Sequence, residues 1–158
     1  MSVWDELTGQ SEAIATCLEM LSRLRTPTLS LVIGEGGSGG ALAIGLTDRI
    51  LMLEHSVYSV ISPRGCASIL WKDAEAEQAA ATQLKLTAPD LLRLGICDEV
   101  IPESPGGAHR GFTQTAASVG ETLRRHLDEL CRMPIDALLD ARYDKFRRIG
   151  HLEHAAPA

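Results

Sequence analysis

The stretch that decides the fold is TLSLVIGEGGSGGALAIGL, residues 28–46. Its first part, residues 28–33, is apolar and partly β-branched, which predicts a short strand. Five glycines then fall within residues 34–40, and the apolar run over residues 41–46 predicts a buried helix. Glycines let a backbone approach a ligand closely, and the free N–H groups of a helix start favour an anion. The stretch therefore indicates an anion-binding loop. The alternative is a tight strand–helix turn that binds no ligand.

Working outward, the same patterns predict an α/β chain with short strands and a helix-rich C-terminal end. The expected strands cover residues 50–53, 57–61 and 97–101. The expected helices cover residues 11–25 with Ser11 as a cap, 63–71 opened by Pro63, 74–84, 89–94, and 113–149 with a break near Met133-Pro134. Residues 102–111 are a loop by composition.

Composition excludes several classes of protein. The 158 residues suit one domain, and 45% hydrophobic residues can form a core. A net charge of −6 and only 4% aromatic residues argue against nucleic-acid binding. No targeting signal or membrane span is expected. The four cysteines form no Cys-x-x-Cys pair, so we expect reduced, mostly buried thiols, no metal site and a cytoplasmic protein.

Three functional interpretations compete for the glycine segment. Gly34, Gly36 and Gly39 match the dinucleotide fingerprint G-x-G-x-x-G, with Glu54 placed 20 residues after the first glycine, where a ribose-binding acid would sit. The lysine of a phosphate-binding P-loop is absent, since an alanine and a leucine follow the last glycines.

The second interpretation is a nucleophile elbow, G-x-S-x-G, centred on Ser38, with Asp98 and His109 downstream in the order of the hydrolases. The third is an oxyanion hole built from backbone amides at the helix start, which needs glycines and an apolar wall but no side-chain acid. The sequence supplies everything that the third interpretation requires.

Residues 26–72 closely resemble the carboxyltransferase α subunit of bacterial acetyl-CoA carboxylase. The blocks GQSEAIA (9–15), CDEVIPESPGGAHR (97–110) and RYDKFRRIG (142–150) extend the similarity in the same order. The resemblance implies a crotonase-like fold of ββα superhelical turns, incomplete here because the family subunit is about twice as long and the N-terminal half has no counterpart. Residues 1–150 are expected to form this partial domain, and residues 151–158 a frayed tail.

The same resemblance implies an enzyme component of fatty acid biosynthesis. The family moves a carboxyl group from carboxybiotin, carried on a separate biotin carboxyl carrier protein, to the α-carbon of an acyl-CoA. A β-type carboxyltransferase subunit completes a hetero-oligomer, and no metal in this chain is implied. Two alternatives stay open: a crotonase-fold decarboxylase or hydrolase of a malonyl-type thioester, and a non-catalytic subunit that completes a partner's fold.

The site residues also follow from the resemblance. Gly39 and Gly40 would present catalytic amides to the biotin side, while Gly36, Gly37 and Ser38 would shape the approach loop. Arg64 stands where the family usually has glutamate, so it would bind an anionic group of the substrate or the partner. His109 is expected near a ligand or a subunit contact.

The remaining noted residues are expected to be structural. Cys66 and Trp71 should pack in the core, and His55 should lie on the surface at a strand end. The basic residues of the last two predicted helices, interspersed with acids, predict a solvated face: Arg124, Arg125, Arg132, Arg142, Lys145, Arg147 and Arg148.

Overall fold

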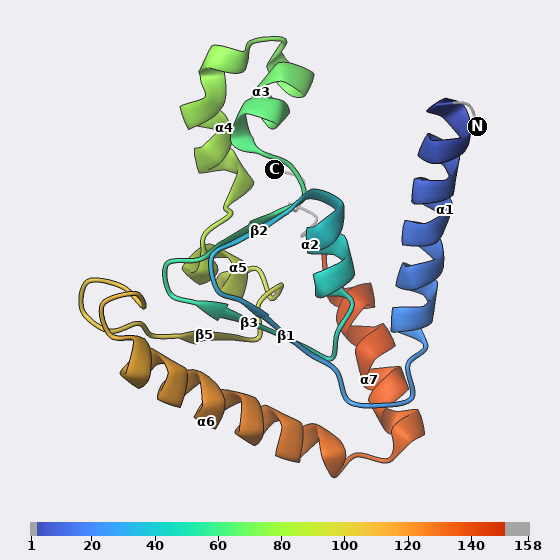
Figure 1. The fold of residues 1–158 in the computed structure, drawn as a ribbon, viewed down its shortest axis with the longest axis vertical. Helices are drawn as coiled ribbons and strands as arrows, with labels where there is room; N and C mark the ends of the chain where they lie inside the picture. The colour runs from blue at the N-terminus through green and yellow to red at the C-terminus, as the bar shows by residue number, and fades with distance from the viewer. Residues whose placement is uncertain (1–2, 151–158) are drawn as a thin grey trace, which may run out of the picture.

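Two small parallel sheets lie at the centre of the molecule in the computed structural model, which describes residues 3–150 (Figure 1). The first sheet has the strand order β1-β3-β5. The second pairs β2 with β4, and every pair of neighbouring strands is parallel. The bounds are β1 Leu29–Val32, β2 Glu35–Gly37, β3 Arg49–Leu53, β4 Val57–Ser59 and β5 Glu99–Ile101. Parallel neighbours need crossover connections, so the predicted α/β class is confirmed.

The helices follow the predicted order. Their bounds are α1 Val3–Ser22, α2 Ser38–Gly45, α3 Pro63–Trp71, α4 Glu77–Leu84 after the short 3₁₀ helix Ala74–Ala76, α5 Ala88–Arg93, α6 Phe112–Cys131 and α7 Ile135–Arg148. Helix α1 begins before Ser11, so the predicted cap there is wrong. None of the helices within residues 3–150 is both long and apolar enough to cross a membrane. The expected frayed tail, 151–158, lies outside the described residues.

The central strand β3 is buried on both faces, which explains its unbroken apolar sequence. Met52 packs with Val32 and with Leu91 of α5 on one side. Leu51 and Leu53 pack on the other side, against the half-buried Val119 and Leu123 of α6. The first sheet is therefore covered by α5 on one face and by α6 on the other.

Two predictions about the core are wrong. Trp71, expected inside, is 44% exposed because it ends α3, whose buried contacts with α4 come from Cys66 and Ala67. Only Cys66 and Cys97 are buried among the thiols, whereas Cys17 and Cys131 are exposed. Cys17 lies on α1, a helix with few packing partners, and Cys131 lies at the last residue of α6.

This difference predicts the order in which the cysteines react. Burial raises the pKa of the Cys97 thiol to about 11, and the nucleophile is the thiolate. We expect a maleimide at neutral pH to label Cys17 and Cys131 in native protein, and Cys66 and Cys97 only after unfolding. Mass spectrometry of the labelled peptides measures this. Equal labelling of all four thiols in native protein would contradict the buried positions.

A buried ion pair ties distant parts of the chain together. Arg142 of α7 donates through Nε to Asp48 Oδ1 at 2.7 Å, and both side chains are only 2% exposed. The guanidinium also donates to backbone oxygens at the end of α1, including Leu24 at 2.9 Å and Leu21 at 3.2 Å. Arg142 therefore does not belong to the predicted solvated face, and neither does Lys145, whose side chain is 10% exposed and pairs with Asp98 at 2.6 Å. It acts as a charged C-terminal cap of α1.

Candidate functional site

The glycine segment forms a short strand and a helix start rather than a simple loop. Strand β2 runs parallel to β4, with Gly36 opposite Tyr58. A Cβ on Gly36 would lie 2.7 Å from Tyr58 Cδ2, and one on Gly45 would lie 2.5 Å from Tyr58 Oη. The Tyr58 hydroxyl donates to the carbonyl of Ala41. These two glycines are thus required by the packing of Tyr58, a residue that sequence reasoning missed.

Helix α2 begins without a side-chain cap. Gly37 is the N-cap residue, and no side chain accepts a hydrogen bond from the first turn. The N–H groups of Ser38, Gly39 and Gly40 consequently have no acceptor within the helix. A Cβ added at Gly39 or Gly40 would meet no atom within 4 Å. The first turn of α2 therefore presents free amides beside open space.

Ser38 carries backbone strain at this point. Its φ of 57° lies in the left-handed region, which costs a residue with a side chain about 1–3 kcal/mol. The strained residue joins β2 to α2 and sets the direction in which the next amides point. Among residues 12–150, no hydrogen bond of its hydroxyl group is found. Ser38 thus contributes its backbone conformation to the helix start.

A second helix start faces the same hollow. The hollow has a volume of about 490 Å³, and its walls include Gly36, Gly37 and Ser38 on one side and Ser62 and Pro63 on the other. These last two residues begin α3, and Ser62 Oγ accepts a hydrogen bond from the Gly65 amide at 3.1 Å. Glu35 and Glu77 also line the hollow, whereas Gly39 and Gly40 are not among its lining residues. Because a helix N-terminus carries a partial positive charge, the two helix ends oppose the negative charge of these carboxylates.

Arg64 is the second residue of α3 and comes directly after Pro63 in the chain. Pro63 lines the hollow, but Arg64 does not. Its guanidinium lies 4.0 Å from the carboxylate of Glu75, and both side chains are largely exposed. An exposed pair at this distance contributes little to stability. The Arg64 side chain is therefore available to another anion.

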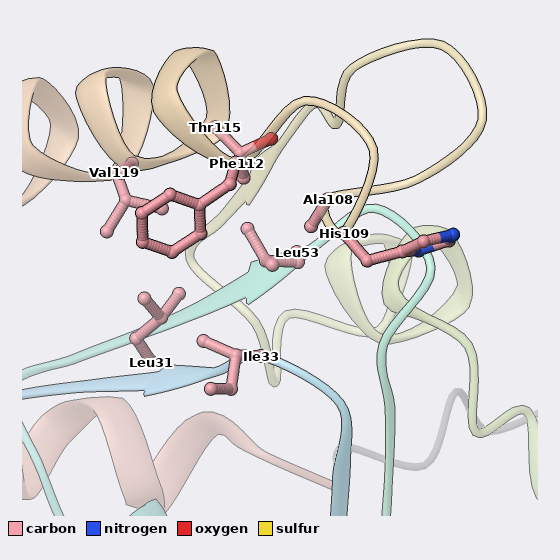
Figure 2. A pocket seen from close by; sticks show the side chains of 9 residues that line it. Leu31, Ile33, Leu53, Ala108, His109, Phe112, Thr115 and Val119 are labelled. Carbon is pink, nitrogen blue, oxygen red and sulfur yellow. The ribbon is translucent and has the colours of Figure 1, made fainter.

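His109 lies elsewhere, on the rim of a separate apolar hollow between β1, β3 and α6. Figure 2 shows its imidazole directed away from the apolar side chains that line this hollow. The loop that carries it is held by Glu103, whose carboxylate accepts from the amides of Ala108 at 2.7 Å and His55 at 3.0 Å. Although burial acts to raise it, these bonds keep the pKa of Glu103 below its usual value. The structure does not bring His109 and the free amides of α2 into one cavity.

The nucleophile elbow is not assembled. Asp98 accepts hydrogen bonds from the Ile50 amide at 2.7 Å and from Lys145 Nζ at 2.6 Å, so it holds β3 and α7 in place. Among the described residues, neither Asp98 nor Ser38 is hydrogen-bonded to His109. The dinucleotide fingerprint fails as well, since its second glycine, Gly36, lies in strand β2 rather than in a loop between a strand and a helix, and Glu54 accepts from the Glu103 amide at 3.1 Å.

The comparisons with known proteins agree with the resemblance stated for residues 26–72. An α subunit of acetyl-coenzyme A carboxylase carboxyl transferase from Shouchella clausii is 54% identical over 148 residues, which are 94% of this chain and 46% of that subunit. The corresponding subunit of Alcanivorax borkumensis is 54% identical over 144 residues, 91% of this chain and 45% of that subunit. The chain spans about half the length of these curated relatives.

Two solved structures show the fold. A chain of a Pseudomonas malonate decarboxylase hetero-tetramer has a TM-score of 0.63 at 20% identity, over 94% of this chain and 61% of that one. An enoyl-CoA hydratase/isomerase from Marinobacter aquaeolei has a TM-score of 0.58 at 14% identity, over 98% of this chain and 57% of that one. The predicted crotonase-like fold, present in part, is confirmed.

The glycine segment, the fold and the relatives all point to one protein family, which matches almost the whole chain. The matching family is described as acetyl co-enzyme A carboxylase carboxyltransferase-like, and it matches residues 2–150. This chain belongs to that family.

Proposed function

We propose that this chain is the oxyanion-binding part of an acyl-CoA carboxyltransferase that works with a β-type subunit and a biotin carboxyl carrier protein. The observation that carries the proposal is the uncapped start of α2, where no side chain accepts from the amides and a Cβ at Gly39 or Gly40 would meet no atom within 4 Å. A carbonyl oxygen that gains negative charge can be held there by two donors that need no reorganisation. The family membership supplies the class of reaction.

Carboxybiotin, when its carrier is docked, would supply the carboxyl group, and the biotin nitrogen that loses it can take the α-proton of the acyl-CoA. In balance, the nitrogen–carbon bond of carboxybiotin and the carbon–hydrogen bond at the α-carbon would break, while the carbon–carbon bond to the carboxyl group and a nitrogen–hydrogen bond on biotin would form. This chain's amides would hold the oxygen on which negative charge develops. The N-terminal ends of α2 and α3 would add a positive field near the first turn of α2, which offsets the carboxylates of Glu35 and Glu77 in the adjoining hollow. The exposed guanidinium of Arg64 is then placed to contact an anionic group of the substrate or the partner.

The test is carboxyl transfer by the complex purified with its β-type subunit. We expect acetyl-CoA to be carboxylated only when carboxylated biotin is present. Turnover of a malonyl-type thioester without biotin would instead support the decarboxylase or hydrolase alternative. Full carboxyl transfer by the partner alone would show that this chain is a non-catalytic subunit.

Ser38→Ala distinguishes an amide site from a serine nucleophile. We expect the variant to keep carboxyl-transfer activity within about threefold, because only the backbone of Ser38 shapes the helix start and a lost surface hydroxyl has a small effect. Steady-state rates of the complex measure this. A dead Ser38→Ala enzyme would favour nucleophilic catalysis and would contradict the proposal.

A further inference from the structure

The side chain of Tyr58 contacts the chain on both sides of the strained Ser38. Its ring lies against Gly36, where an added Cβ would be 2.7 Å from Cδ2, and its hydroxyl donates to the carbonyl oxygen of Ala41. Gly36 comes two residues before Ser38 and lies in β2, whereas Ala41 comes three residues after it and lies in α2. The uncapped amides at the start of α2 therefore lie between two points that one side chain holds.

The backbone of Ser38 needs such contacts. Its φ of 57° is unfavourable for a residue with a side chain, and a strained conformation persists only where the surrounding structure fixes it. Pairing of β2 with β4 fixes the residues before Ser38, since Gly36 lies opposite Tyr58 in that ladder. The Tyr58 hydroxyl acts on the residues after it, through the carbonyl of Ala41.

Tyr58 is itself held in place by the core. Its amide donates to the carbonyl oxygen of Leu86 at 3.0 Å. Its half-buried side chain packs against the cluster that contains Val32, Met52 and Leu91. Burial also raises the pKa of its hydroxyl above the ordinary 10.0, so the group is protonated and can donate at neutral pH. The hydroxyl thus reaches α2 from a fixed position.

Gly45 leaves the space that this hydrogen bond requires. It is the last residue of α2, and a Cβ there would lie 2.5 Å from Tyr58 Oη but 3.8 Å from Tyr58 Cζ. Glycine disfavours a helix, so a glycine at this buried position has a packing reason. The Ala41 oxygen has two lone pairs and can accept from the hydroxyl as well as from an amide of the helix.

We propose that Tyr58 is a positioning residue for carboxyl transfer, because its hydrogen bond to Ala41 keeps the first turn of α2 in the orientation that directs the amides of Gly39 and Gly40 toward the oxyanion. This role rests on the proposed function of those amides. Tyr58 does not line the hollow beside the start of α2, although both of its chain neighbours do. It therefore acts through the backbone of α2 and not by contact with the reacting groups.

The first experiment replaces Tyr58 by phenylalanine, which removes the hydroxyl and keeps the ring. In the complex with the β-type subunit, Tyr58→Phe should lower kcat for carboxyl transfer on the order of 10-fold, because a small misplacement of catalytic groups is costly. The KM values for acetyl-CoA and carboxybiotin should stay within about twofold. Tyr143→Phe is the matched control: Tyr143 is 65% exposed on α7, and the change should leave kcat and KM unaltered. Urea denaturation checks that each variant is folded.

A double-mutant cycle with Gly39→Ala separates positioning from a purely structural role. If Tyr58 acts through the Gly39 amide, the two losses are not independent. Tyr58→Phe should then lower kcat by less than about threefold in the Gly39→Ala complex, because groups that act as a unit give non-additive effects. A purely structural effect of the lost hydroxyl would instead lower the rate by the same factor in both complexes.

Gly45→Ala tests the same hydrogen bond from the side of α2. Its Cβ would displace the Tyr58 hydroxyl, so we expect a loss of kcat on the same order as that of Tyr58→Phe and a lower midpoint of urea denaturation. Combining the two changes removes Oη and leaves an ordinary 3.8 Å contact to Cζ. The double variant should therefore regain stability without regaining the rate.

Three results would overturn the positioning role. They are an unchanged kcat in the Tyr58→Phe complex while Gly39→Ala is impaired, an equal loss in the Tyr143→Phe complex, and independent losses in the double-mutant cycle. A Gly39→Ala complex that keeps its full rate would overturn the proposed function itself, and the role of Tyr58 with it. The two failures are thus told apart by the Gly39→Ala complex alone.

Discussion

Replacing Gly39 by alanine is expected to lower the rate of carboxyl transfer by about 10²–10³-fold, the usual loss when one oxyanion donor fails. The same change should leave the chain as stable as before or more stable by about 0.5–1 kcal/mol, because alanine favours a helix over glycine. The added Cβ meets no atom of this chain within 4 Å, so it would crowd only a bound group. Activity and stability are thus expected to move in opposite directions. Rates of the complex and urea denaturation of the chain measure the two effects.

Two other glycines provide the controls. Gly120→Ala, in the middle of α6, makes the same chemical change with an ordinary 3.9 Å contact to Arg124 Nη2, and should raise stability with unchanged activity. Gly36→Ala should lower both the stability of the chain and the activity of the complex, because the added Cβ would lie 2.7 Å from the Tyr58 ring. A fully active Gly39→Ala complex would contradict the oxyanion assignment. A Gly39→Ala complex whose activity falls only in proportion to a loss of folded protein would also contradict the oxyanion assignment.

Replacing Arg142 by methionine is expected to lower the free energy of unfolding by about 3–5 kcal/mol, because it leaves the buried Asp48 carboxylate without its cation. The backbone oxygens of Leu21, Leu24 and Thr26 lose a donor at the same time. Arg147→Met, on the exposed face of the same helix, should change stability by less than about 0.5 kcal/mol. Chemical denaturation of the chain measures both. Equal effects of the two substitutions would contradict the buried position of Arg142.

The effect of this substitution should depend on pH. Burial acts to raise the pKa of Asp48, but hydrogen bonds from Arg142 and Thr28 outweigh it and hold that pKa below its ordinary 3.8. A carboxyl group whose pKa is lowered by folding stabilises the native state above its unfolded pKa. That contribution is lost as the pH falls through the folded value. We therefore expect the difference between wild type and Arg142→Met to shrink as the pH falls. It begins to shrink at the pKa of Asp48 in the variant, which burial without the cation raises, and it is lost below the lowered pKa of Asp48 in the wild type.

Local sequence determined most of the elements. Pro63 begins α3 as predicted, because the signals for a helix start lie within a few neighbouring residues, and the structure adds Ser62 as the N-cap. The break at Pro134 separates α6 from α7 for the same reason. The resemblance of residues 26–72 also predicted the family and the fold correctly.

Only the tertiary structure decided which polar groups are buried and which apolar groups are not. Arg142 is 94 residues away from Asp48, so nothing in the composition of its own helix distinguishes it from the solvated arginines around it. The one available signal is its place four residues after the buried Leu138, on the same helix face.

The glycine segment shows both contributions at once. Its composition alone predicted a backbone that approaches another group closely. The structure divides that composition between two purposes: Gly36 and Gly45 admit Tyr58, while Gly39 and Gly40 leave open space beside free amides. The physical reason is the separation along the chain of the residues that determine each feature. Backbone freedom and helix starts are properties of a few neighbouring residues, whereas the position of Tyr58 depends on pairing β2 with a strand about twenty residues away.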